Sequence, residues 1–121
     1  MNPYDTAHAL LKDIRGTSEF QRLKEVHDRL EKDESALRML QDYRRREWEF
    51  QAQFAEGKTP SEEERRRFEQ LTQVVMLNQD IAEYLALERH VTSVLMDIYQ
   101  LLGKGLEDAL FPHPVIQENR G

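Results

Sequence analysis

The chain has 121 residues, the length of one domain, and its 39% hydrophobic and 33% charged residues suit amphipathic helices that are partly buried by a partner. Its net charge of -6 gives no overall attraction to nucleic-acid phosphates, so such binding would require a local basic patch. The absence of cysteine excludes disulfides, thiolate metal sites, cysteine nucleophiles and cysteine-held iron–sulfur clusters.

Apolar residues recur at spacings of three and four along the whole chain, and strand-like alternation is absent. This pattern predicts an all-α fold of about five helices. The first is expected over 3–15, with Asn2 as its N-cap. The second is expected over about 19–32, with Ser18 and Gln21 as a capping box.

The third and fourth helices are predicted to form a long antiparallel hairpin. The third follows the N-cap Asp33 and runs to about residue 56. The fourth is expected to start with Thr59 as cap and Pro60 in the first helical position, and to run to about residue 77. A connection of only about three residues makes the two helices neighbours, and we expect their hairpin to project beyond the rest of the fold.

The fifth helix is predicted to begin after Asn78 and to run to about residue 102, where two glycines break the pattern. Residues 1–110 then form a single helical domain. We expect the tail, residues 111–121, to be without regular structure because its prolines prevent a helix. The alternative is that the apolar residues of the tail dock on the body or on a partner.

The apolar arcs of the third and fifth helices approach half of the circumference, which is more than contact with one neighbour requires. We therefore predict a second layer, supplied by another copy of the chain as a homodimer or higher oligomer. The alternative is a compact monomer whose first two helices cover the aromatic residues Trp48, Phe50 and Phe54. The predicted oligomer interface comprises Tyr43, Glu47, Trp48, Phe50, Phe54, Arg67, Phe68 and Leu71.

Several charged residues fall inside the apolar arcs of the third, fourth and fifth helices. Glu47 and Arg67 are near each other in the predicted hairpin, so we consider a partly buried pair that sets register within the hairpin or across a dimer. The simpler interpretation, which we favour, is that both groups reach solvent. Glu88 could act as an acid if buried, but a paired interface charge is the favoured interpretation.

Two arginine triplets, 44–46 and 65–67, lie among aromatic residues, as in some nucleic-acid surfaces. Three consecutive helical residues fan over about 200°, so a triplet cannot form one flat patch. Acidic residues also stand beside both triplets. We favour a solvated charged face and keep a nucleic-acid contact as the alternative, carried by Arg45, Arg46, Arg65 and Arg66.

No catalytic constellation is found. The sequence contains no HExxH or Glu-x-x-His motif, nucleophile elbow or glycine-rich phosphate loop. Asp5 and His8 have the spacing of two ligands on one helix face, a pattern that is common by chance. We therefore expect a protein that is not an enzyme and that holds no cofactor or metal.

Two segments carry a family resemblance. "NPYDTAHALLKDIRGTSEFQRLKEVHDRLEKDESALRMLQDYRRREWEFQ" and "LNQDIAEYLALERHVTSVLMDIYQLL" resemble the bacterial YlbF/YmcA family, especially its YheA-like branch, over roughly residues 3–106. The resemblance implies an all-helical cytoplasmic protein that self-associates through a long helical hairpin. Some members are adaptors in a regulatory complex linked to competence, biofilm formation, sporulation and RNA processing with an endoribonuclease.

Those members hold an iron–sulfur cluster with cysteines, so the cluster does not carry over to a chain without cysteine, and membership of that complex stays open. We predict a non-enzymatic helical adaptor that binds itself and another protein. The alternative is an RNA-associated regulatory factor, linked to RNA processing through the family resemblance. No signal peptide and no apolar run of ~20 residues occurs in the sequence, so we expect a cytoplasmic protein without a membrane partner.

Overall fold

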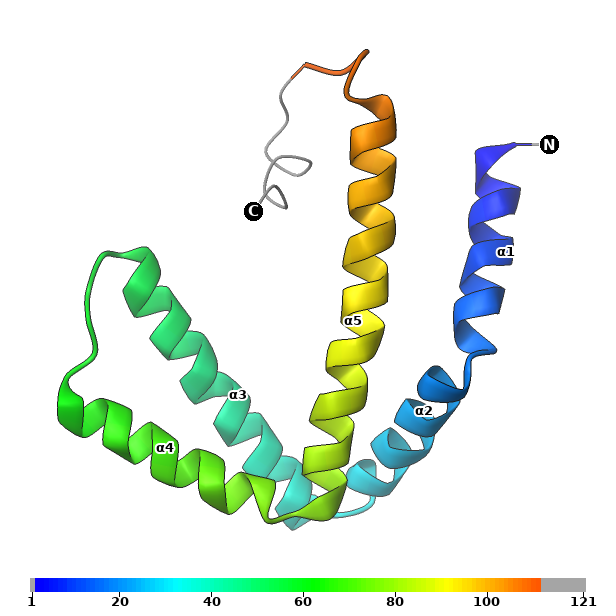
Figure 1. The fold of residues 1–121 in the computed structure, drawn as a ribbon. Helices are drawn as coiled ribbons and strands as arrows, with labels where there is room; N and C mark the ends of the chain where they lie inside the picture. Colours follow the sequence, from blue (N-terminus) through cyan, green and yellow to red (C-terminus); the bar gives the residue numbers. More distant parts are fainter. Residues whose placement is uncertain (1, 112–121) are drawn as a thin grey trace.

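The computed structural model describes residues 2–111, which form five α-helices and no strand (Figure 1). The all-α prediction is confirmed. The helices are α1 (Pro3–Arg15), α2 (Ser18–Glu31), α3 (Glu34–Ala55), α4 (Glu62–Met76) and α5 (Gln79–Leu106). Of the predicted tail, Phe111 is described and exposed, whereas residues 112–121 lie outside the described part.

Each helix begins at a polar side chain that accepts a hydrogen bond from a free backbone N–H of the first turn. The predicted caps are confirmed at three helices. Asn2 accepts from the amide of Asp5 at 2.9 Å, and Asp33 and Asn78 begin α3 and α5 in the same way at 3.1 Å.

Two predicted caps are wrong. Helix α2 is capped by Thr17, one residue before the predicted Ser18; both residues are good caps, and local sequence does not choose between them. Helix α4 is capped by Ser61 instead of Thr59, and Pro60 is buried in the loop before the helix. The acidic residues that follow Ser61 occupy the first turn, where the helix dipole favours negative charge.

The connection between α3 and α4 therefore spans residues 56–61 and is longer than predicted. The end predicted for the fifth helix is also wrong, because α5 continues through Gly103 and Gly105 to Leu106. A glycine inside a helix costs only about 1 kcal/mol relative to alanine, so it weakens a helix without ending it.

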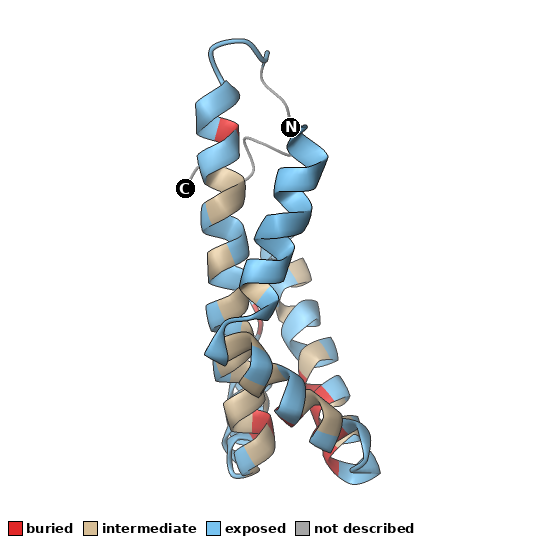
Figure 2. Cartoon of the chain, turned by 90° about the vertical axis from the view of Figure 1, so that its right-hand side faces the viewer, coloured by how far each residue is buried: buried red, intermediate tan, exposed pale blue. Residues whose placement is uncertain are grey.

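The buried core lies at one end of the molecule, where α2, the start of α3, the end of α4 and the start of α5 meet (Figures 1 and 2). From there α1 and the second half of α5 rise on one side, and α3 and α4 lead away on the other (Figure 1). The core residues are Val26, Leu30, Ala36, Leu40, Tyr43, Val75 and Ile81. In the described part of the chain, no helix is long and apolar enough to cross a membrane.

An aromatic cluster joins α3 to α4. The rings of Tyr43 and Phe68 are stacked, with centroids 5.5 Å apart and planes 12° apart, and Phe50 lies 4.8 Å from Phe68. Such pairs stabilise a contact beyond the area that they bury. Towards the connecting loop the two helices spread apart (Figure 1).

Candidate interaction surface

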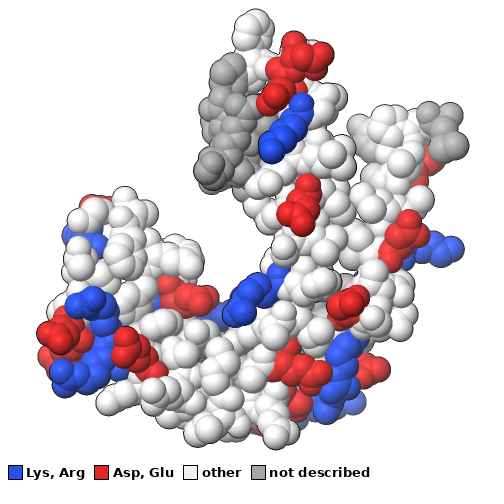
Figure 3. Space-filling model, in the orientation of Figure 1, with Lys and Arg blue, Asp and Glu red and all other residues white. Residues whose placement is uncertain are grey.

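A cleft opens between α3 and α5, and we call it the α3–α5 cleft (Figure 3). At its base lies a cavity of about 220 Å³ where α2, α3 and α5 meet. The cavity is lined by His27, Leu30, Glu31, Leu37, Leu40, Gln41, Arg44 and Tyr84. The lining combines apolar side chains with a few charged ones, which is typical of a binding surface.

An ion pair between Arg44 of α3 and Glu88 of α5 crosses the base of the cleft. The Arg44 guanidinium also lies 5.9 Å from the ring centroid of Tyr84, one turn before Glu88. The Arg44 side chain is 41% exposed and that of Glu88 is 29% exposed. Glu88 is a paired charge, as expected, but its partner is Arg44 of the same chain and not a residue across an interface.

The same contacts shift the pKa values of this group. Burial raises the pKa of Tyr84, and the charge of Glu88 raises it further. Burial alone would lower the pKa of Arg44, but the hydrogen bond to Glu88 raises it overall. The cleft therefore holds a phenol whose pKa is raised beside an ion pair, an arrangement suited to structure and contact rather than to proton transfer.

Two further ion pairs fix α2 against α5 and so position the cleft. Arg22 binds both carboxylate oxygens of Glu83, at 2.6 and 2.8 Å, and this bidentate hydrogen bond lowers the pKa of Glu83. Arg29 lies 3.5 Å from Asp80, one turn earlier on α5. Both pairs are partly exposed, so they direct the packing of the helices more than they stabilise it.

The predicted interface residues divide into two groups. Tyr43, Phe50 and Phe68 pack against one another, and Leu71 is half-buried beside the core. Trp48 and Phe54 are 68% and 62% exposed and remain available for contact. Because Trp48 follows Arg44 by four residues, it lies on the face of α3 that forms the wall of the cleft.

The pair of Glu47 with Arg67, considered for the interior of the hairpin, is not formed within the chain. Arg67 instead pairs with Glu63 on its own helix at 2.7 Å, and both side chains are exposed. Glu47 is also exposed. The Glu63 carboxylate lies one turn before Arg67 on the same helix, so it is within easy reach of the guanidinium.

Acidic residues lie beside both arginine triplets, Asp42 on α3 and Glu63 on α4. Arg45 and Arg46 both pair with Asp42, and Arg65 and Arg66 are exposed. Paired charges of both signs form a weak electrostatic footprint for a phosphate backbone. Nucleic-acid contact by these arginines stays a prediction.

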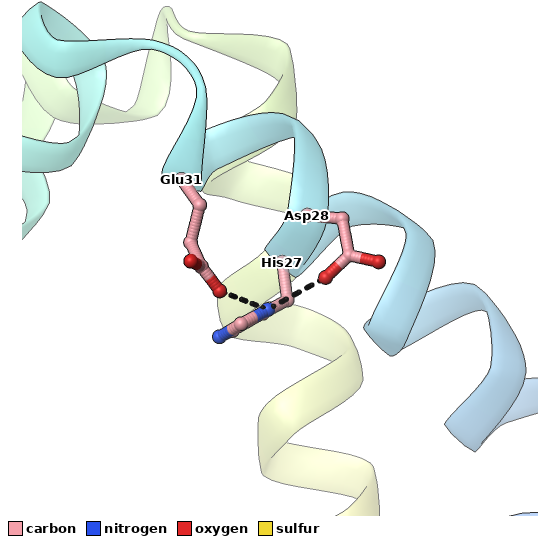
Figure 4. A group of neighbouring side chains, drawn as sticks. All are labelled: His27, Asp28 and Glu31. Atoms are coloured by element: carbon pink, nitrogen blue, oxygen red, sulfur yellow. Dashed lines mark hydrogen bonds and ion pairs between the residues drawn. The ribbon is translucent and has the colours of Figure 1, made fainter.

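One cluster was not singled out from the sequence. His27 Nδ1 lies 3.1 Å from carboxylate oxygens of both Asp28 and Glu31 (Figure 4). The spacing of four residues between His27 and Glu31, which puts both on one helix face, is the sequence feature that indicates this cluster. Both carboxylates approach the same nitrogen, and Lys24 holds Asp28 at 2.8 Å, so the geometry fits an exposed charge cluster better than a metal site.

The fold and these contacts define a small all-α protein whose apolar surface lies along helix faces. Comparison with known families agrees with this class: the family described as "Control of competence regulator ComK, YlbF/YmcA" matches residues 4–107. The chain therefore belongs to the YlbF/YmcA family, as its sequence indicates.

The chain matches several relatives over almost their whole length. A UPF0342 protein of Halothermothrix orenii is 35% identical over 104 residues, covering 86% of this chain and 88% of the relative. Another UPF0342 protein, from Alkalihalophilus pseudofirmus, is 32% identical over 107 residues, covering 88% of this chain and 91% of the relative. No solved structure matches the chain.

Proposed function

We propose that this protein is a non-enzymatic adaptor of the cytoplasm, which self-associates through apolar helix faces and presents a surface to a protein partner. The observation that carries the proposal is the amount of apolar surface left uncovered. Trp48 and Phe54 are exposed on α3, as are Leu95, Leu101 and Leu102 on α5. We interpret this exposed apolar surface on a small protein as an interaction site.

The family also supports a regulatory role, since its description refers to control of a competence regulator. The relatives are named only as UPF0342 proteins, so that role comes to this chain as part of the proposal. The cleft supports binding rather than catalysis, because its charged groups are paired with one another. A protein partner would meet apolar walls around a fixed ion pair.

Light scattering on the purified chain tests self-association. We expect the intact chain to have the mass of a dimer or higher oligomer. The variant Trp48→Glu, Phe54→Glu should shift towards the monomer, because each glutamate would place a charge in the contact. Circular dichroism should show that the variant keeps its helices.

The variant Gln70→Glu, Gln73→Glu is the matched control. It adds two glutamates on the exposed face of α4, away from Phe68 and Val75, and should keep the wild-type mass. A wild-type chain that is monomeric up to about 100 μM would contradict the proposal, since stable interfaces have dissociation constants well below this.

A further inference from the structure

The second half of α5 is more apolar than an exposed helix should be. Between residues 91 and 102 the only charged residue is Asp97. None of the residues in this range, all of which the structure describes, is buried. A helix with so little charge normally lies inside a protein, and residues 2–111 do not bury this apolar row.

A row of residues on α5, apolar except for Glu88, follows the alternating spacing of four and three that is typical of paired helices. We call this row the α5 seam. It consists of Tyr84, Glu88, Val91, Leu95, Ile98 and Leu102. Its first two members contact Arg44, so the α5 seam faces the α3–α5 cleft and continues out of it along the free half of the helix.

The positions beside the α5 seam are also uncharged. Thr92 and Tyr99 flank it on one side, and Val94 and Leu101 on the other. In paired helices these flanking positions usually carry the charges that select a partner of opposite charge. Their absence leaves nothing to select a charged partner, and it removes the like-charge repulsion that would oppose pairing with an identical helix.

We propose that the α5 seam pairs with the α5 seam of a second copy of this chain, with the two helices antiparallel. The pairing places Leu95 against the partner's Ile98 and Val91 against the partner's Leu102. This inference rests on the proposed self-association and names the surface that carries it.

The antiparallel direction follows from the position of the core. Helices α2, α3 and α4 surround the start of α5, so only the second half of the α5 seam is free (Figure 1). Antiparallel pairing puts the two cores at opposite ends of the dimer, where they do not collide. It also makes the two helix dipoles point in opposite directions, which is favourable. It also directs the end of the partner's α5 into the α3–α5 cleft.

The length of the contact explains why the cleft takes part. Residues 91–102 rise only about 16 Å along the helix, and a stable interface covers about 800 Å² on each partner. Contact along the free part of the α5 seam alone falls short of this area. Trp48, exposed on the opposite wall of the cleft, supplies additional apolar surface next to it.

Cysteine cross-linking tests the pairing, since the natural chain has no cysteine that could compete. Under mild oxidation, the variant Val91→Cys, Leu102→Cys should form a disulfide-linked dimer. Val91→Cys alone and Leu102→Cys alone should stay uncross-linked, because a disulfide needs Cα atoms within about 7 Å. The absence of cross-linking in the double variant, or equal cross-linking in the single ones, would overturn antiparallel pairing.

Charge insertion provides a second test. Leu95→Glu places a carboxylate on the α5 seam and should weaken the dimer at least about tenfold, as measured by sedimentation equilibrium. Ser93→Glu adds the same group on the outer face of the same helix and should leave the dimer intact. A dimer that both variants leave unchanged would overturn the α5 seam while self-association stands, whereas a monomeric wild type would remove both proposals.

Discussion

Arg44 and Glu88 are 44 positions apart in the sequence and form one ion pair, which joins α3 to α5 at the base of the α3–α5 cleft. The Tyr84 ring lies beside the guanidinium. The pair therefore sets the position of the hairpin relative to α5, and with it the shape of the cleft that Trp48 borders.

A double-mutant cycle on this pair, Arg44→Met with Glu88→Gln, should show a coupling free energy of about 1 kcal/mol in urea unfolding. We expect a larger coupling free energy than for an exposed ion pair because the Glu88 side chain is mostly buried. The exposed pair Arg67–Glu63 serves as the control and should show at most about 0.5 kcal/mol. Equal couplings for the two pairs would mean that the cleft pair does not position the helices.

Phe68→Ala should lower the free energy of unfolding by about 2 kcal/mol, because Phe68 contacts both Tyr43 and Phe50 between α3 and α4. Phe54→Ala removes a ring of the same size that is exposed, and should cost less than about 1 kcal/mol. Urea unfolding at a protein concentration low enough to keep the chain monomeric measures both, since self-association through Phe54 would otherwise add to its loss. A larger loss for Phe54 would place it, rather than Phe68, in a contact that stabilises the fold.

The start of α4 can be tested with two small substitutions. Ser61→Ala removes the oxygen that accepts from the Glu64 amide at 3.1 Å and should cost about 1 kcal/mol. Thr59→Ala, at the cap predicted from sequence, should leave the thermal midpoint nearly unchanged. The reverse order would show that the helix starts at Pro60 after all.

Stability should fall in acid partly through Glu83. Its pKa is lowered from the ordinary value of 4.5 by Arg22, so the pair contributes fully above that value. The contribution is lost as the pH falls through the lowered pKa, because protonation then breaks the pair. The urea concentration at the unfolding midpoint should fall between about pH 6 and about pH 3, and this fall should be smaller in Glu83→Gln than in the wild type. An equal difference in the two proteins would contradict this linkage.

The arginine triplets should not bind RNA. Fluorescence anisotropy with a labelled single-stranded RNA should show no salt-dependent binding at low ionic strength, because acidic residues pair with members of both triplets, Asp42 with Arg45 and Arg46 and Glu63 with Arg67. Replacing Arg45, Arg46, Arg65 and Arg66 by glutamine is the matched comparison. Binding that disappears in this variant would support the RNA-associated alternative.

The sequence by itself determined the helical class and most helix limits, since these depend on local spacing and on capping side chains. The predicted range of α1 matches Pro3–Arg15, and the caps Asn2, Asp33 and Asn78 are found where expected. The lack of cysteine likewise needs no structure to exclude a thiolate-bound cluster.

Only the tertiary structure decided which side chains meet. In the structure Arg44 pairs with Glu88, and Arg67 pairs with Glu63. Tyr43 and Phe50 pack on Phe68, whereas Trp48 stays exposed. The tertiary structure also carried α5 past two glycines that local preference predicted as an end. These outcomes depend on the angles between helices, which arise from packing among residues distant in the chain, and a helical wheel holds no information about them.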